Sequence, residues 1–342
     1  MRVVRRIRPI GVSVPKKKLL ISIVVPVYNE AGVIEQIHAR LASVLDTLPH
    51  DFEIFYVNDG SIDRTDASLE MLTAQDPRVH RLSLSRNFGH QAALSAGLDH
   101  AGGDVVISMD GDGQHPPEMI PQMLELIGQG YDVVQAQRIE ESRGPSFKKI
   151  SSDLFYWLIN HISGTHIEQG AADFRALSRQ ALDALIAMPE YHRFLRGMTA
   201  WIGYSTVILP YHEPKRVAGK SKYSLGKMLR LASDAIFSFS LMPLYIGLSA
   251  GGVFILLALA QMIYVLVLWL AGETARIVPG WSSLMAVLLI ASGIIMILLG
   301  FIGVYVGYIF QQVKGRPVYL IKKQPDDSEI PAPAKSMNDK RR

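Results

Sequence analysis

Short hydrophobic runs rich in β-branched residues alternate with amphipathic stretches over the first part of the chain. The runs read LISIVV, EIFYVN, VHRLSL, DVVISM and DVVQA, and helical patterns such as GVIEQIHARLASVL and PPEMIPQMLELIG separate them. Continuous apolar runs joined by helical segments are typical of βαβ units, in which helices cover both faces of a parallel sheet. The pattern therefore predicts one α/β domain over residues 19–220.

Two longer apolar segments follow this domain, and neither residues 241–270 nor residues 281–312 contain a charge. A membrane-spanning helix needs about 20 predominantly apolar residues, so we expect spans at about residues 243–270 and 281–310, within a membrane region of residues 241–312. Lysine and arginine flank the pair on one side, whereas the loop between the spans holds one Glu and one Arg. The positive-inside rule then places the α/β domain and both termini in the cytoplasm, in a multi-pass protein of the inner (cytoplasmic) membrane.

Three charged or amphipathic segments complete the predicted organisation: a basic arm (1–18), a juxtamembrane amphipathic helix (221–240) and a basic, partly disordered tail (313–342). The first 20 residues carry seven Lys or Arg and no acid, so the remainder of a chain of net charge +4 sums to −3. This distribution argues against a nucleic-acid-binding domain and favours an arm that contacts membrane lipids.

Composition removes several kinds of chemistry. The 342 residues include no cysteine, which excludes disulfides, thiolate metal sites and cysteine nucleophiles. The ten histidines show no zinc-binding spacing. We interpret His90, His115 and His192 as packing or hydrogen-bonding residues.

Polar clusters follow three of the predicted strands: PVYNE after the first, NDGS after the second and DGDGQ after the fourth. In open α/β sheets, ligands bind beyond the carboxyl ends of the strands. Asp110 and Asp112, spaced i and i+2, can converge on one hard cation whose shell is completed by substrate phosphates, and Gln114 adds a third oxygen. The cluster predicts Mg²⁺ or Mn²⁺ bound to a diphosphate. An EF-hand does not fit, because Pro121 stands where its twelfth residue would be Glu.

Several motifs together carry a resemblance to a known family. The stretches PVYNE, VNDGS, LSRNFGHQAALSAGLDHAGGDVVISMDGDGQHPPE, DFRALSR, RFLRGMTAWIGY and RVAGKSKYS resemble the polyprenyl-phosphate glycosyltransferases of glycosyltransferase family 2. The chain looks most like the bacterial branch with two spanning helices, and is similar to dolichol-phosphate mannose synthases and undecaprenyl-phosphate glucosyltransferases. The resemblance covers about Leu20 to Leu320 and implies a GT-A (Rossmann-like) domain followed by interfacial helices and a transmembrane hairpin.

The resemblance implies an activity: inverting transfer of a sugar from a nucleotide-sugar to polyprenyl (undecaprenyl) phosphate, giving a lipid-linked sugar donor for cell-envelope glycan or lipid modification. A phosphate monoester is already largely ionised near neutral pH, since its second pKa is about 6. The acceptor therefore needs no strong general base, and catalysis is expected to depend on positioning and charge.

Roles for individual residues follow from the same resemblance. Asp173 matches an acid near the acceptor site, and a local ion pair with Arg175 is its alternative interpretation. Two positions depart from the family pattern: Asn58 stands where many relatives have Asp, and Gly113, where most have Leu, is expected to loosen the metal loop. The implied sets are Pro26, Tyr28, Glu30, Asp59 and Asp110 for the nucleotide-sugar; Asp110, Asp112 and Gln114 for the metal; Arg138 and Arg216 for phosphate; and Asp112, Asp173, Arg216 and Lys222 for catalysis.

Other interpretations stay open at this point. Lys148, at the start of an amphipathic run, would suit the acceptor phosphate or lipid headgroups, or simply a solvated face. Two rival functions are a processive polysaccharide synthase and a catalytically silent membrane scaffold. UDP-glucose is the first choice of donor, ahead of GDP-mannose and modified UDP-sugars, because pocket shape rather than a motif sets sugar selectivity. Glycines in both apolar segments suit helix association, so a homo-oligomer is compatible with the sequence.

Overall fold

The computed structural model describes residues 18–139, 171–212 and 280–322, with scattered positions between 249 and 272. The chain forms two compact units. The first comprises Met1–Asn160, Thr165–Ser224 and Pro317–Arg342, and the second comprises His161–Gly164 and Leu225–Arg316. The basic arm up to residue 17, the juxtamembrane segment, Lys148, Arg216 and Lys222 lie outside the described residues.

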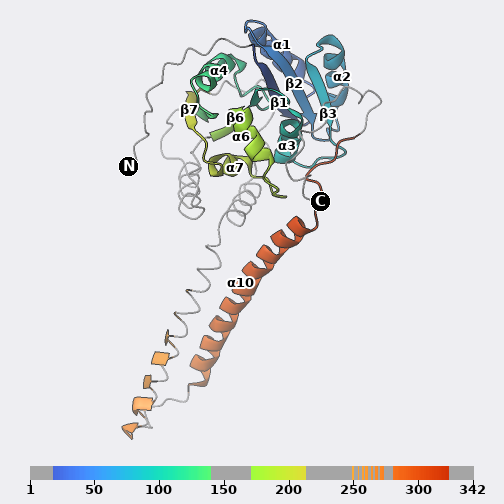
Figure 1. Ribbon diagram of the computed structural model, residues 1–342. Helices are drawn as coiled ribbons and strands as arrows, with labels where there is room; N and C mark the ends of the chain where they lie inside the picture. Colours follow the sequence, from blue (N-terminus) through green and yellow to red (C-terminus); the bar gives the residue numbers. More distant parts are fainter. Residues whose placement is uncertain are drawn as a thin grey trace. The chain divides into compact units, whose positions relative to one another are not determined.

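The first unit is built on a seven-stranded sheet of order β3-β2-β1-β4-β6-β5-β7 (Figure 1). Neighbouring strands are parallel except at β6, which runs antiparallel to both β4 and β5. The sheet is therefore mixed rather than purely parallel. A strand buried on both faces has the same apolar pattern in either direction, so the pattern could not reveal this reversal. The strands are β1 (Leu20–Val27), β2 (Asp51–Asn58), β3 (Val79–Ser83), β4 (Val105–Ser108), β5 (Val133–Arg138), β6 (Ala171–Ser178) and β7 (Thr206–Tyr211).

Helices cover both faces of this sheet, as the pattern predicted: α1, α2 and α4 lie on one face, and α3 and α6 lie on the other (Figure 1). Helix α1 forms because its apolar residues recur at helical spacing, and it buries Ile34, Ile37, Leu41 and Leu45 as one stripe. The helices are α1 (Ile34–Leu45), α2 (Thr65–Gln75), α3 (His90–His100), the 3₁₀ turn η1 (Pro117–Met119), α4 (Ile120–Gly128), α6 (Arg179–Ile186) and α7 (Leu195–Trp201).

Helix α3 lies unusually close to the sheet. Its sequence, HQAALSAGLDH, is rich in small residues, and a Cβ atom on Gly97 would approach the Cγ1 atom of Val24 to 2.3 Å. The helix therefore packs with its backbone against β1 and β2. This close packing holds the N-terminal end of α3, at His90, next to the carboxyl ends of the parallel strands.

The second unit contains α10 (Trp281–Val313), a helix of 33 residues. Its portion Ile290–Val313 has a mean hydropathy of 2.3, and within the described part of the chain it is the one helix long and apolar enough to cross a membrane. This helix coincides with the second predicted span. The first predicted span falls largely outside the described residues, although its described positions from 253 to 270 are helical.

Candidate active site

The three polar clusters lie at one edge of the sheet, as the strand pattern predicted. In the parallel pair β1–β2, Val27 is paired with Asn58, and in β1–β4, Val24 is paired with Ser108. The residues that follow these strands therefore emerge side by side. β5 is parallel to β4 through the intervening antiparallel β6, so Arg138 at its end also belongs to this edge.

Asp59 is the most deeply buried carboxylate of the predicted nucleotide site, with 4% of its surface exposed. Its carboxylate accepts hydrogen bonds from the backbone N–H groups of Phe88 at 2.7 Å and Gly89 at 3.0 Å. Burial raises the pKa of Asp59 although these bonds oppose the shift. Gly60 adopts φ 64°, and a Cβ there would lie 2.4 Å from the backbone carbon of Arg86. The loop of residues 86–89 is thus packed directly against the end of β2.

Asn58 has a structural role that accounts for its departure from the family pattern. Its side-chain oxygen accepts from the N–H of Ser61 at 2.9 Å, and its amide nitrogen donates to Asp66 at 3.0 Å. Asp66 also accepts from the hydroxyl of Ser83 at 2.7 Å. Because a carboxylate needs donors rather than a second carboxylate, an amide at position 58 suits this chain.

The first prediction follows from this contact. Asn58→Asp should lower the stability of the first unit by about 1–3 kcal/mol, because it replaces a donor to Asp66 with a like charge at a position that is 3% exposed. Thermal melting of the full chain in detergent at pH 8 measures the loss. At lower pH the penalty should shrink, because one of the two carboxyls takes up a proton. Ser83→Ala, which removes a donor without adding charge, serves as the control, and an equal, pH-independent loss in both variants would contradict the charge argument.

The DGDGQ loop places two carboxylates on either side of a glycine that the fold requires. A Cβ on Gly111 would lie 2.6 Å from Cγ1 of Val27, so the loop rests against the end of β1. Gly113 adopts φ 79°, a conformation that favours glycine. Asp112 accepts a hydrogen bond from the N–H of Gln114 at 3.1 Å. Glycine at position 113 therefore fits a compact turn, whereas the sequence had suggested a loosened loop.

Two histidines contact Asp110. His115, which is 5% exposed and stacks on Phe174, accepts a hydrogen bond from the Asp110 N–H at 2.8 Å. The Nε2 atom of His90 lies 3.3 Å from Oδ1 of Asp110 and 3.4 Å from Oδ2 of Asp173. His90 thus bridges the predicted metal loop and the predicted acceptor-site acid. The sequence predicts packing or hydrogen bonding for both histidines and a place in the site for neither.

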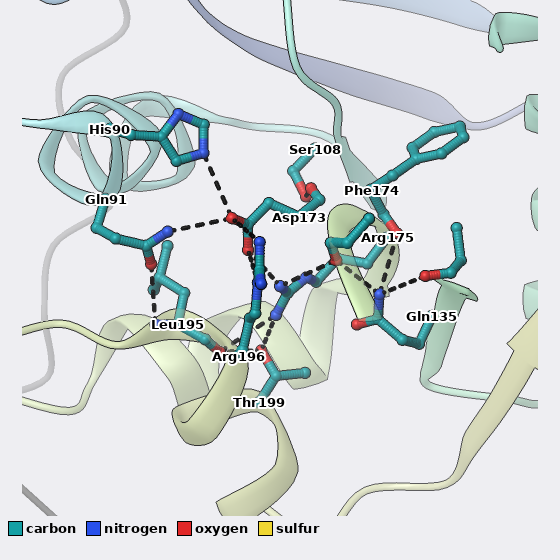
Figure 2. A network of polar contacts seen from close by, with 12 residues as sticks. His90, Gln91, Ser108, Gln135, Asp173, Phe174, Arg175, Leu195, Arg196 and Thr199 are labelled. Atoms are coloured by element: carbon teal, nitrogen blue, oxygen red, sulfur yellow. Dashed lines mark hydrogen bonds and ion pairs between the residues drawn. The ribbon is translucent and has the colours of Figure 1, made fainter. Parts of the chain in front are cut away.

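Asp173 lies at the centre of a buried network (Figure 2). It is 3% exposed, and its carboxylate accepts two hydrogen bonds from Arg196, both at 3.0 Å, and one from Arg175 at 2.8 Å. Gln91 donates to the Asp173 carboxylate at 3.2 Å, and the backbone oxygen of Asp173 accepts a hydrogen bond from the hydroxyl of Ser108 in β4. The ion pair with Arg175 that the sequence offered as an alternative is therefore present, within a larger set of contacts.

Electrostatics fixes the charge state of this network. Burial raises the pKa of Asp173, but Arg196, His90 and Arg175 outweigh it and hold the pKa well below its usual value. Desolvation lowers the pKa of His90, but the carboxylates of Asp110 and Asp173 raise it to about 9. Asp173 is consequently an ionised acceptor and His90 a cationic donor near neutral pH. An ionised carboxylate with a lowered pKa is a poor proton acceptor, but it can hold neighbouring cationic side chains in place.

Residues 29–31 are tied to the loop that follows β2. Asn29, at φ 55°, accepts from the N–H of Ile62 at 2.9 Å, and the N–H of Glu30 donates to Thr65 at 2.9 Å. These bonds hold the PVYNE and NDGS segments together at the sheet edge. Of the predicted site residues, the structure thus brings Pro26, Tyr28, Glu30, Asp59, Asp110, Asp112, Gln114, Arg138 and Asp173 to this one edge.

The loop suits a divalent cation that shares its ligands with a substrate. Within the described ranges there is no group of three or more His, Asp or Glu residues that could hold a metal alone. Asp110 and Asp112 offer two carboxylates, and Gln114 offers an amide oxygen. The buried Oδ1 of Asp110 makes no hydrogen bond, and its near neighbour is the Nε2 atom of His90 at 3.3 Å. Mg²⁺ commonly binds one or two carboxylates together with substrate phosphates. The donor set fits such an ion.

Gln91 and Arg196 also belong to the site, although neither is among the residues that the sequence predicts for it. Both lie within stretches that carried the family resemblance, GHQAAL and RFLRG. The signal was their presence in those motifs. Their convergence on Asp173 depends on the packing of α3 and α7, which no local pattern reveals.

Comparisons with known proteins place the chain in a family. The protein-family model described as "Glycosyl transferase family 2" matches residues 22–186 of this chain. The uncharacterized glycosyltransferase YkcC of Bacillus subtilis is 40% identical, covering 88% of this chain and 93% of the relative. The SfII prophage-derived bactoprenol glucosyl transferase of Shigella flexneri is 39% identical, with 89% and 97% covered. The structure of glucosyl-3-phosphoglycerate synthase from Mycobacterium tuberculosis, in complex with Mn²⁺, UDP-glucose and phosphoglyceric acid, shares 18% identity at a TM-score of 0.44, with 64% and 78% covered.

Proposed function

Because the chain belongs to glycosyltransferase family 2, we propose that it transfers a sugar, with glucose as the first choice, from a nucleotide-sugar to polyprenyl phosphate. The products are a nucleoside diphosphate and a polyprenyl-phosphate sugar, formed with inversion at the anomeric carbon. One observation carries the proposal: Asp59, Asp110 and Asp112 follow strands that end at one edge of the sheet, in a chain that matches a bactoprenol glucosyl transferase over 97% of that relative.

The nucleotide half of the site is assigned to the ends of β1, β2 and β4. Asp59, held by the N–H groups of Phe88 and Gly89, faces the nucleobase and ribose, and Pro26, Tyr28 and Glu30 line the adjoining loop. Asp110, Asp112 and Gln114 would hold Mg²⁺ or Mn²⁺. When bound, this ion would supply positive charge that stabilises the departing diphosphate.

The acceptor half is assigned to cationic residues. Arg138 is placed at the same edge, at the end of β5, and Lys148, Arg216 and Lys222 are proposed to join it around the lipid phosphate. These cations hold two anions close together, and the guanidinium group is suited to bidentate phosphate contact. The acceptor oxygen is already ionised, so no residue has to remove a proton from it.

We assign Asp173 an orienting role in this reaction. Its carboxylate is saturated by Arg175, Arg196 and Gln91, and its low pKa makes it unsuited to proton transfer. It fixes the position of His90, which contacts Asp110. Through this contact, the network sets the geometry of the loop of residues 110–114.

The membrane arrangement is part of the proposal. Helix α10 is one span, residues 243–270 form the other, and residues 221–240 form an interfacial helix that keeps the catalytic domain at the cytoplasmic face. A lipid-linked phosphate lies at that surface, so a membrane-anchored domain meets its acceptor there. Association of the spans through their glycines would give a homo-oligomer.

A donor panel tests this function. Purified full-length protein is incubated with undecaprenyl phosphate and radiolabelled UDP-glucose, GDP-mannose or UDP-N-acetylglucosamine, with Mg²⁺, Mn²⁺ or EDTA. We expect one labelled lipid product that requires the cation. A long carbohydrate polymer would instead indicate a processive synthase, and inactivity with every donor and cation would point to a silent scaffold.

A further inference from the structure

The chain returns to the first unit immediately after its apolar helix. α10 ends at Val313, and Pro317 is again part of the first unit. Residues 320–322 add a short antiparallel segment to the outer edge of the sheet, beside β3 (Figure 1). The N–H of Ser85 donates to the oxygen of Leu320 at 2.8 Å, and the N–H of Lys322 donates to the oxygen of Ser83 at 2.8 Å.

This contact covers the sheet edge next to the loop whose backbone binds Asp59. β3 is the edge strand of the sheet, and such an edge offers unpaired backbone groups. Leu84, which is paired with Ile321 and 3% exposed, also donates its N–H to the oxygen of Asn58 at 2.9 Å. The strand that the segment pairs with is therefore continuous with the loop of residues 86–89, whose backbone holds Asp59.

A second contact leads to the Asp173 network. The hydroxyl of Tyr319 donates to Asp99, near the end of α3, at 2.9 Å. Arg193 donates to the same carboxylate at 3.3 Å, and the side chains of Asp99 and Arg193 are each 14% exposed. Arg193 lies three residues before Arg196, and Arg196 donates to both carboxylate oxygens of Asp173.

The segment thus contacts two elements that reach the active site. Through Ser83 and Ser85 it fixes the start of the loop that binds Asp59, and through Tyr319 it fixes the far end of α3 and the residues before α7. His90, which bridges Asp110 and Asp173, lies between these two attachments along the chain.

We propose that Tyr319 and the backbone of Leu320–Lys322 are positioning residues, which hold the 86–90 loop and so set the affinity of the active site for its nucleotide. This inference rests on the proposed function for the identity of the ligand. The segment after the apolar helix thus acts through its backbone and the Tyr319 hydroxyl, whereas the sequence pattern predicted a basic, partly disordered tail over residues 313–342.

One pair of variants isolates the backbone contact. Lys322→Pro removes the N–H that donates to Ser83, whereas Lys322→Ala keeps that N–H and removes the charged side chain. With UDP and MnCl₂ as the probe, calorimetry on the full chain in detergent should show a dissociation constant raised roughly threefold to thirtyfold in Lys322→Pro and within about twofold of wild type in Lys322→Ala. A merely structural contact would lower the fraction of folded protein, and with it the number of sites, without changing this constant. Equal dissociation constants in the two variants would overturn the proposal.

Two further comparisons keep the test decisive if Lys322→Pro folds poorly. A chain that stops after Lys323 keeps the segment, and a chain that stops after Arg316 lacks it. Only the shorter chain should show faster amide exchange in peptides covering residues 86–90, since Phe88 and Gly89 donate to Asp59. Tyr319→Phe should give a milder increase. If amide exchange at residues 86–90 is unchanged in both the shorter chain and Tyr319→Phe, the inference is refuted, whether or not the protein binds UDP. Failure of the protein to bind UDP would count against the proposed function alone.

Discussion

Asp112→Ala is expected to reduce metal-dependent sugar transfer by roughly 10²- to 10³-fold. The physical reason is that in the proposed site Asp110 and Asp112 would supply the two charged ligands of the cation, and a single carboxylate holds a divalent cation much less well. Asp112→Asn should lose nearly as much activity, although it keeps an oxygen that can accept from the N–H of Gln114. The initial rate of labelled-lipid formation at saturating Mn²⁺ measures both losses.

The matched control for Asp112 is Asp183→Asn. Asp183 forms an exposed ion pair with Arg179 on α6, far along the sequence from the metal loop, and its loss should leave the rate within about twofold of wild type, in line with the small worth of surface pairs. Full activity of Asp112→Asn in the presence of EDTA would refute the assignment of a metal to this loop.

Most of the fold could be predicted because its elements obey local rules. The β-branched runs became β1 to β5, and GVIEQIHARLASVL contains α1 with its apolar stripe. The reversal at β6 could not be predicted, because residues 173–177 are buried like those of a central parallel strand, and such a pattern is the same in either direction. The return of residues 320–322 to β3 was equally hidden, since a sheet edge recruits a partner through backbone groups rather than through a side-chain pattern.

The sequence could predict those site residues that directly follow a strand. Asp59, Asp110 and Asp112 follow strands directly, so the strand pattern alone placed them at one edge. The residues around Asp173 come from β4, α3, β6 and α7, and they meet only through tertiary packing (Figure 2). His90 shows the difference well. The sequence indicated a packing or hydrogen-bonding residue, and its position between two carboxylates became visible only in the fold.

The largest expected effect on stability is that of Asp173→Asn. The substitution keeps the shape of the side chain but removes the charge that pairs with Arg175 and Arg196, and Arg175 is 2% exposed. Removing one partner of a buried ion pair leaves the other charge uncompensated, at a cost of about 3–5 kcal/mol. Melting of the full chain in detergent should show this loss. Asp183→Asn is again the control, because it breaks an ion pair on a helix surface and should cost at most about 0.5 kcal/mol.

The pH dependence of this loss separates a charge effect from a packing effect. The pKa of Asp173 in the folded chain lies well below its ordinary value of 3.8, so its ionised form stabilises the fold at every pH above that value. The stability is lost progressively as the pH falls from the ordinary value of 3.8 through the lowered pKa of the folded state. The difference in melting temperature between wild type and Asp173→Asn should therefore persist from pH 8 to about pH 4 and shrink below it. A difference that is small at pH 8, or that disappears near pH 6, would show that the ionised carboxylate does not hold Arg175 and Arg196 in place.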